Sequence, residues 1–399
     1  MSQVNVFHYV EEGYNVRLFL EKSIISLVIA LLLGGFPAQS EEFGPHEFSV
    51  LYTPIIQRSV RSSETNANAE LDLIGRFRLS SGNTGTWGET HLSFWALGNH
   101  TLGGTISAGA FSRRSGLLWD SNDGDAPDPD WLLGIFALQQ EFRIGATSGQ
   151  VELGKIYPGL TLASLPYAGD DRDSFMSQII SSDAAGRWFD RIGIGASFSV
   201  RQNLWFANLL VSDATAQDRG FDFETIKDGS NLYALELGVT PTIAGRASRV
   251  SLMPYVINSS DEFSRERGLV LILSHDLTTG GAEGLAPLVL FGRYTLRTGG
   301  EPLTANARDD AKSLKRGGFV GLALNRPFGR DMQQIGIALM HGSPSKTAMS
   351  NGFGSQTGVE TYWKTSFGKS AEFTTGLQVI DRGAMGLEFI PGLRLKLSY

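Results

Sequence analysis

Residues whose types suit the binding of a polar solute are concentrated in one segment, "YPGLTLASLPYAGDDRDSFMSQIISSDAAGRWFD" (157–190). The segment contains carboxylates and guanidinium groups, among them Arg172 and Asp173, and the indole ring of Trp188. Charged groups of both signs can hydrogen-bond hydroxyl groups, and an aromatic ring can stack on an apolar face. The segment is therefore the first candidate binding site, and an ordinary loop whose charges are solvated by water is the alternative.

A second polar stretch, "DSNDGDAPDPD" (120–130), offers oxygen ligands of the kind that calcium prefers. Its glycine, Gly124, stands at the fifth position rather than the sixth of an EF-hand loop, and no glutamate follows at the twelfth. The absence of cysteine also excludes thiol-based zinc sites and disulfides. We predict a solvated loop here, with no metal and no cofactor.

Catalytic patterns are weaker still. The six histidines are scattered, and neither H-E-x-x-H nor G-x-S-x-G occurs. The run Ser274–His275–Asp276 contains the residue types of a hydrolytic triad, but adjacent residues on a strand point to opposite faces and cannot form one site. We therefore predict that the protein is not an enzyme and has no catalytic residues.

The N-terminal region has the features of an export signal. The uncharged run "SIISLVIALLLGGF" (23–36) is too short to span a bilayer comfortably, and small residues, Ala38 and Ser40, occupy the −3 and −1 positions of a cleavage site. We predict a signal peptide over 1–40 and Sec-type export, with a signal anchor as the alternative and a start codon downstream of Met1 left open. A net charge of −7 excludes a nucleic-acid partner.

The rest of the chain is rich in period-two alternation, which is typical of β-strands. In "LDLIGRFRL" (71–79), "YALELGV" (233–239) and "LFGRYTLR" (290–297), apolar residues recur on one face and charged residues on the other. The charged face carries Arg76, Arg78, Glu236 and Arg293. A soluble sandwich also alternates in this way, so the pattern of connections must decide between the two architectures.

The connections favour an all-β transmembrane barrel. Odd-numbered links between the predicted strands are long and even-numbered links are short, as expected for short periplasmic turns and longer extracellular loops. Residues 41–69 are predicted as a periplasmic lead-in and residues 70–399 as the barrel domain, in which Arg76, Arg78, Glu236 and Arg293 line the lumen. The sixteen predicted strands are 70–79, 88–97, 103–111, 133–142, 149–156, 191–200, 204–212, 231–240, 249–257, 268–276, 286–297, 317–325, 334–341, 358–366, 371–380 and 391–399.

The terminal "PGLRLKLSY" fits this architecture. Leu393, Leu395 and Leu397 would face lipid, while Arg394 and Lys396 would face a water-filled lumen and be solvated there. Tyr399 would lie at the membrane–water interface, where aromatic rings collect. We predict that this strand closes the barrel against the first one, and that the barrel-assembly machinery recognises the C-terminal strand ending at Tyr399.

Three segments resemble a known family. "GGFVGLALNRPFGRDMQQIGIAL" (317–339), "VETYWKTSFGKSAEFTTGLQVI" (359–380) and "GLRLKLSY" look like the closing hairpins of carbohydrate-selective porins of the OprB type, although "EFTTGLQVI" replaces a proline-and-aspartate form. The resemblance implies a channel in the outer membrane of a Gram-negative bacterium for passive diffusion of mono- and small oligosaccharides. It also implies contact with outer-membrane lipid and lipopolysaccharide.

The resemblance to porins further assigns a role to segment 157–190, the third long link. In general porins the third extracellular loop folds inward and narrows the pore, so Arg172, Asp173 and Trp188 would meet a sugar there. The sequence leaves open a general non-selective porin for small hydrophilic solutes and ions, an outer-membrane barrel enzyme of the lipase or protease kind, and a structural barrel. It also leaves open the identity of the sugar and the choice between a monomer and a homotrimer.

Overall fold

The structure is a computed structural model, and the regions it describes begin at residue 46. The predicted signal peptide (1–40) lies outside them, as does most of the acidic stretch 120–130. The described residues are 46–82, 86–122, 124, 130–170, 172–215, 220–221, 223, 225–279, 287–304, 314–327, 330 and 332–399.

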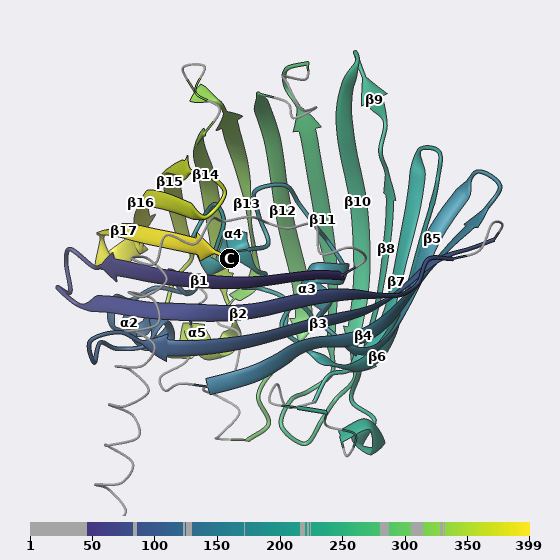
Figure 1. Ribbon diagram of the computed structural model, residues 1–399. Coiled ribbons are helices and arrows are strands. Elements are labelled where there is room, and N and C mark those ends of the chain that lie inside the picture. The colour runs from purple at the N-terminus through teal and green to yellow at the C-terminus, as the bar shows by residue number, and fades with distance from the viewer. Residues whose placement is uncertain are drawn as a thin grey trace, which may run out of the picture. The chain divides into compact units, whose positions relative to one another are not determined.

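Within these residues, sixteen antiparallel strands form a closed barrel (Figure 1). A short additional strand, β9 (Thr242–Ile243), pairs with the start of β10. The barrel strands are β1 (His46–Arg58), β2 (Thr65–Ser80), β3 (Trp87–Thr101), β4 (Asp130–Ile144), β5 (Thr147–Ile156), β6 (Gly193–Gln202), β7 (Trp205–Asp213), β8 (Asn231–Val239), β10 (Arg246–Ile257), β11 (Glu266–Asp276), β12 (Leu288–Gly299), β13 (Leu314–Asn325), β14 (Gln333–Pro344), β15 (Gln356–Phe367), β16 (Ala371–Asp381) and β17 (Leu387–Ser398).

Helical elements are short. They are α2 (Ala108–Arg114), α3 (Pro158–Thr161), α4 (Gln178–Ser181), α5 (Lys346–Ser350) and two 3₁₀ turns, η1 (Thr225–Asp228) and η5 (Gly383–Met385). Among the described residues, no helix is both long enough and apolar enough to cross a membrane.

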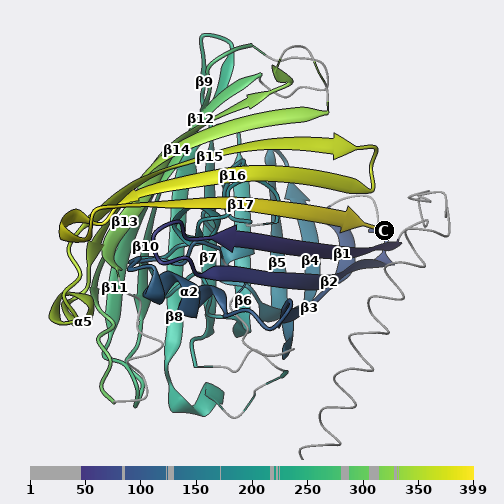
Figure 2. The same ribbon diagram turned by 90° about the vertical axis from the view of Figure 1, so that its left-hand side faces the viewer.

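The first and last strands close the barrel, as predicted for the C-terminal strand. β1 pairs with β17 on one side and with β2 on the other. Val50 and Tyr399 exchange two backbone hydrogen bonds of 3.0 Å. Figure 2 shows β1 and β17 running side by side up to the C-terminus. Closure leaves neither β1 nor β17 with an unpaired edge, which a lipid environment could not satisfy.

One of the sixteen predicted strands was wrong and one real strand was missed, so the two errors cancelled in the count. Residues 46–58, assigned to a lead-in segment, form β1 of the barrel. Pro54 weakens the strand signal because it has no N–H to donate, and the recorded pairing with β17 skips it. The predicted strand 103–111 is instead a turn, with Gly103 at φ 62°, followed by α2. Ser107 caps that helix by accepting a hydrogen bond from the backbone N–H of Ala110 (3.3 Å).

The two ends of the barrel differ. At one end, named the short-turn end here, strands are joined by links such as 145–146 and 203–204. At the other, the long-loop end, the links include 102–129 and 157–192. Because strand 103–111 does not exist, the alternation of the two ends shifts by one strand. The link 81–86 therefore belongs to the short-turn end, whereas the predicted strands placed it at the long-loop end.

The faces of the strands agree with the predicted parity. Leu235, Leu237 and Leu393 are exposed on the outside of the barrel. The residues that follow Leu235 and Leu393 in the chain, Glu236 and Arg394, point to the inside and are buried. A wall with exposed apolar side chains outside and polar side chains inside is the arrangement of a transmembrane β-barrel.

The core of the protein lies inside the barrel. Residues 157–192, named the inner loop here, carry α3 and α4 and pack against the inward faces of the strands. Phe175, Ile180 and Trp188 of the inner loop belong to one buried cluster with wall residues such as Phe291 and Met340. A second inward segment follows α2, where the backbone carbonyl of Ser121 accepts hydrogen bonds from Gln57 and Gln378. The inward fold of the third long loop, which the porin resemblance implied, is therefore present.

Candidate functional site

Wall carboxylates hold the inner loop by its backbone. Glu360 on β15 accepts hydrogen bonds from the N–H groups of Met176 (2.7 Å) and Ser177 (3.1 Å). Glu236 on β8 accepts one from Ala163 (3.1 Å), and Glu266 on β11 accepts one from Arg187 (3.0 Å). All three glutamates are buried, so each satisfies loop donors that water cannot reach.

Wall arginines bind the carbonyl groups of the same loop. Arg293 on β12 donates to the carbonyl of Ile180 (3.1 Å), and Arg394 on β17 donates to that of Ser174 (3.0 Å). Arg293 and Arg394 are buried beneath the loop. The prediction that water solvates Arg394 is therefore wrong. Glu236 and Arg293 do lie on the inner face, but they hold the inner loop and do not line an open pore wall.

Trp188 cannot stack on a solute. Its side chain is 0% exposed, and its indole N–H donates to Asp183 Oδ2 (2.8 Å). Asp183 Oδ2 also accepts from Thr295 Oγ1 on β12 (2.6 Å). The prediction of a sugar-stacking ring was wrong because the inner loop folds around this tryptophan and uses it as a core residue.

Arg172 ties the inner loop to β2. Its Nη1 lies 2.5 Å from Asp72 Oδ1, and its Nε lies 2.7 Å from Asp170 Oδ1. Trp95 Nε1 donates to the same oxygen of Asp72 (2.7 Å). Burial alone would raise the pKa of Asp170, but the guanidinium of Arg172 outweighs it and lowers that pKa. Arg172 is nearly buried and fully engaged, which leaves it as an anchor and not a free solute-binding group.

Asp173 pairs with two cations from neighbouring strands. Its Oδ1 lies 2.8 Å from Lys364 Nζ on β15 and 3.8 Å from Lys396 Nζ on β17. Burial would raise its pKa, but these two ammonium groups outweigh burial and lower the pKa to about 2. The Asp173 side chain is 42% exposed, so it is the one predicted loop residue of the three that faces open space.

Arg76 and Arg78 lie on the inner face of β2 outside the footprint of the inner loop. Arg76 Nη2 is 3.3 Å from Glu141 Oε1 on β4, and Arg78 Nη1 is 2.9 Å from Glu89 Oε1 on β3. Their side chains are 39% and 35% exposed. Of the four predicted wall residues, these two face solvent and the other two, Glu236 and Arg293, do not.

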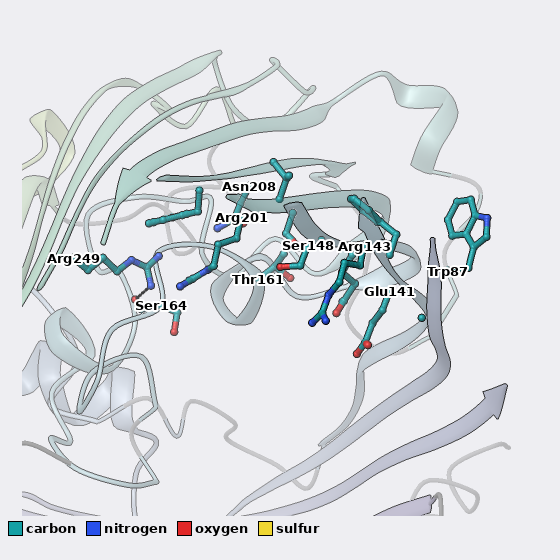
Figure 3. A pocket seen from close by; sticks show the side chains of 16 residues that line it. Trp87, Glu141, Arg143, Ser148, Thr161, Ser164, Arg201, Asn208 and Arg249 are labelled. Carbon is teal, nitrogen blue, oxygen red and sulfur yellow. Dashed lines mark hydrogen bonds between the residues drawn. The ribbon is translucent and has the colours of Figure 1, made fainter. Parts of the chain in front are cut away.

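A cavity of about 580 Å³ lies between the inner loop and the short-turn end (Figure 3). Its wall comes from residues near the ends of β3, β4, β5, β6, β7 and β10, and its roof comes from Thr161 and Ser164 of the inner loop. The polar residues that line it are Glu141, Arg143, Ser148, Gln150, Thr161, Ser164, Ser199, Arg201, Asn208 and Arg249.

Three arginines of this cavity, Arg143, Arg201 and Arg249, were not predicted from the sequence as site residues. The predicted strands 133–142 and 191–200 ended just before Arg143 and Arg201, whereas β4 and β6 continue to residues 144 and 202. Extending the period-two pattern by one more inward position would have found both residues. Across the described residues, no group of three histidine or acidic side chains is arranged to hold a metal ion.

Comparison with known proteins finds similar solved structures but no similar sequence. Neither a family model nor a curated protein sequence matches the chain. The high-pH structure of OprB from Pseudomonas putida is similar, with a TM-score of 0.69 and 13% identity over 89% of this chain and 94% of that one. The low-pH structure of the same protein gives a TM-score of 0.54 at 13% identity, over 89% of this chain and 93% of that one.

A third solved structure also has a similar fold. OmpT, an outer membrane protein of Vibrio cholerae, in a variant that lacks loop L8, gives a TM-score of 0.51 at 9% identity over 89% of this chain and 99% of that one. Likeness at these identities defines architecture. The chain has the sixteen-stranded barrel fold of the porins, and the predicted fold class is confirmed.

Proposed function

We propose that the protein is an outer-membrane porin of a Gram-negative bacterium through which carbohydrates diffuse passively. The observation that carries this proposal is the arrangement of the barrel. Its outer face exposes apolar side chains such as Leu237 and Leu393, and its inside contains a folded-in loop beside a charged cavity. A sixteen-stranded barrel has the diameter that leaves room for an aqueous passage.

The cavity is the part of the lumen suited to a sugar. It presents hydroxyl groups on Ser148, Ser199 and Thr161, and amides on Gln150 and Asn208, all of which can exchange hydrogen bonds with sugar hydroxyls. The resemblance of the closing hairpins to carbohydrate-selective porins, together with the fold likeness to OprB, supports the same substrate class. Diffusion through water in such a passage uses no energy source.

The surroundings follow from this proposal. The apolar outer face contacts outer-membrane lipid, and its long-loop end contacts lipopolysaccharide. The C-terminal strand, ending at Tyr399, is the segment that the barrel-assembly machinery recognises. The mass of the detergent-solubilised protein distinguishes a homotrimer from a monomer.

Reconstitution tests the function directly. Purified, folded protein in planar bilayers should give discrete conductance steps, and in liposomes it should admit glucose and maltose without an energy source. Partial block of the current by neutral sugars would support carbohydrate selection, whereas free passage of sugars and salts without block would favour a general porin. Liposomes that stay impermeable to sugars and ions would overturn the proposal and favour a structural barrel.

A further inference from the structure

The lining of the cavity is unevenly charged, and the imbalance concerns two arginines. The one carboxylate among the described lining residues, Glu141, pairs with Arg76 (3.3 Å), and the lining residue Arg249 pairs with Glu236 (2.6 Å). In the part of the chain that the structure describes, the guanidinium groups of Arg143 and Arg201 form no ion pair, and both side chains are exposed to the cavity. The site therefore has an excess of positive charge in a concave space.

Strand register places these two arginines in one row. Arg143 on β4 pairs with Ser148 on β5, and Ser148 pairs with Arg201 on β6. Since neighbouring strands are about 4.8 Å apart, the two arginine backbones stand roughly 10 Å from each other with a serine hydroxyl between them. Figure 3 shows the side chains of Arg143 and Arg201 extending to the same side of their strands.

A second row lies one inward position deeper, with neutral polar groups between two carboxylates, Glu141 on β4 and Glu236 on β8, each of which is paired with an arginine. Gln150 on β5 pairs with Ser199 on β6, and Ser199 pairs with Asn208 on β7. The roof adds Ser164, whose backbone carbonyl accepts a hydrogen bond from Arg249 Nη1 (2.8 Å). The cavity thus offers cationic forks near the short-turn end and hydroxyl or amide groups behind them.

We infer that this cavity selects anionic carbohydrates, with Arg143 and Arg201 binding the acidic group and the second row binding the ring hydroxyls. The inference rests on the proposed function and narrows its substrate class to sugar acids, whose carboxylate matches a guanidinium fork with two parallel hydrogen bonds. A sugar phosphate presents the same charge to the same forks. Neutral sugars would share only the hydroxyl contacts and bind more weakly.

Matched probes separate charge from shape. Binding of glucuronate, glucuronamide, glucose 6-phosphate and glucose to the folded barrel in detergent is measured by equilibrium dialysis, which does not depend on transport. Glucuronate should bind about tenfold more tightly than glucuronamide, a molecule of nearly the same shape in which a neutral amide replaces the carboxylate, because charge-assisted hydrogen bonds are about twice as strong as neutral ones. Equal binding of the two would overturn the inference. A strong preference for glucose 6-phosphate over glucuronate would reassign the acidic group from carboxylate to phosphate.

Variants then locate the site. The double change R143Q plus R201Q should remove the preference for glucuronate over glucuronamide, while R267Q, at an exposed arginine near the long-loop end of β11, should leave it intact. The conservative pair R143K plus R201K keeps the charge but loses the fork, and it should retain a weaker, more salt-sensitive preference. An unchanged preference in the glutamine variant would refute the assignment. Since conductance in bilayers is measured separately, a protein that conducts and admits glucose but fails this test keeps the proposed function and loses only the inference.

Discussion

Two parts of the inner wall share the same strand parity and have opposite surroundings. The packed wall, formed by the inward faces of β12–β16, is covered by the inner loop, and its residues Phe291, Ala338 and Ile380 are almost completely buried. The open wall, formed by the short-turn halves of β4–β7, faces the cavity with Gln150 and Ser199 partly exposed. Parity decides only that a side chain points inward. A contact with a distant loop decides whether it meets water.

Charged residues show the same difference. On the packed wall, Glu360 and Arg293 form hydrogen bonds with the backbone of the inner loop. On the open wall, Arg143 and Arg201 remain directed at the cavity. A charged inward residue in this barrel is therefore either a structural anchor for the loop or a candidate contact for a solute, and burial separates the two roles.

The largest expected effect comes from removing a core ring of the inner loop. Trp188→Ala should lower the free energy of unfolding by about 3–5 kcal/mol, because Trp188 is 0% exposed and its loss leaves a cavity. Trp87→Ala, at a tryptophan beside the open cavity that is 61% exposed, should cost far less. Denaturant titration followed by circular dichroism measures both. Similar costs for the two changes would mean that the packed and open regions are not distinct.

A smaller effect should follow from removing one anchor. Glu360→Ala leaves the buried N–H groups of Met176 and Ser177 without their acceptor, at a cost of roughly 1–3 kcal/mol for each donor. Gln150→Ala on the open wall should change stability little, because water replaces its hydrogen bonds. Hydrogen exchange at the amides of residues 176 and 177 should accelerate in the first variant only. Unchanged exchange there would show that the inner loop is held by other contacts.

The smallest effect concerns the ion pairs of Asp173 at the margin of the packed wall. Because its pKa is lowered to about 2, its contribution to loop docking is present above its ordinary pKa near 3.8 and is lost as the pH falls from about 4 to about 2. Lys364→Gln removes the nearer ammonium and should move the Asp173 pKa back up, which carboxyl NMR titration can follow. A titration midpoint that stays in place after this change would assign the low pKa to other charges.

The fold was largely predictable because it rests on local patterns. Alternation in segments such as 233–239 and 290–297 gave the inward and outward faces, and the alternating link lengths indicated a barrel. The two strand errors also have local causes. Pro54 obscured β1, and the alternating residues of 103–111 suggested a strand where Ser107 starts a helix.

The candidate site was predicted less well, because it depends on contacts between distant segments. The inner loop and the inward positions of Arg76 and Arg78 were predicted from the sequence. The sequence could not show that Trp188 and Arg293 would be buried between the loop and the wall. Arg143 and Arg201 were missed because the predicted strands ended at residues 142 and 200, one residue before each arginine, whereas β4 and β6 continue to residues 144 and 202. Which inward residues stay free is a property of the folded loop.

The pairing of β1 with β17 has a consequence for the order of events during synthesis. It joins residues such as Leu51 and Ser398, which lie at opposite ends of the sheet in sequence, so it cannot form before β17 has been synthesised. Until β17 has been made, both β1 and the most recent strand present unpaired backbone edges that can join other chains. The barrel therefore has no smaller closed precursor. Closure must wait until β17 has been synthesised, and the unfinished barrel has to be kept apart from other chains for that whole time.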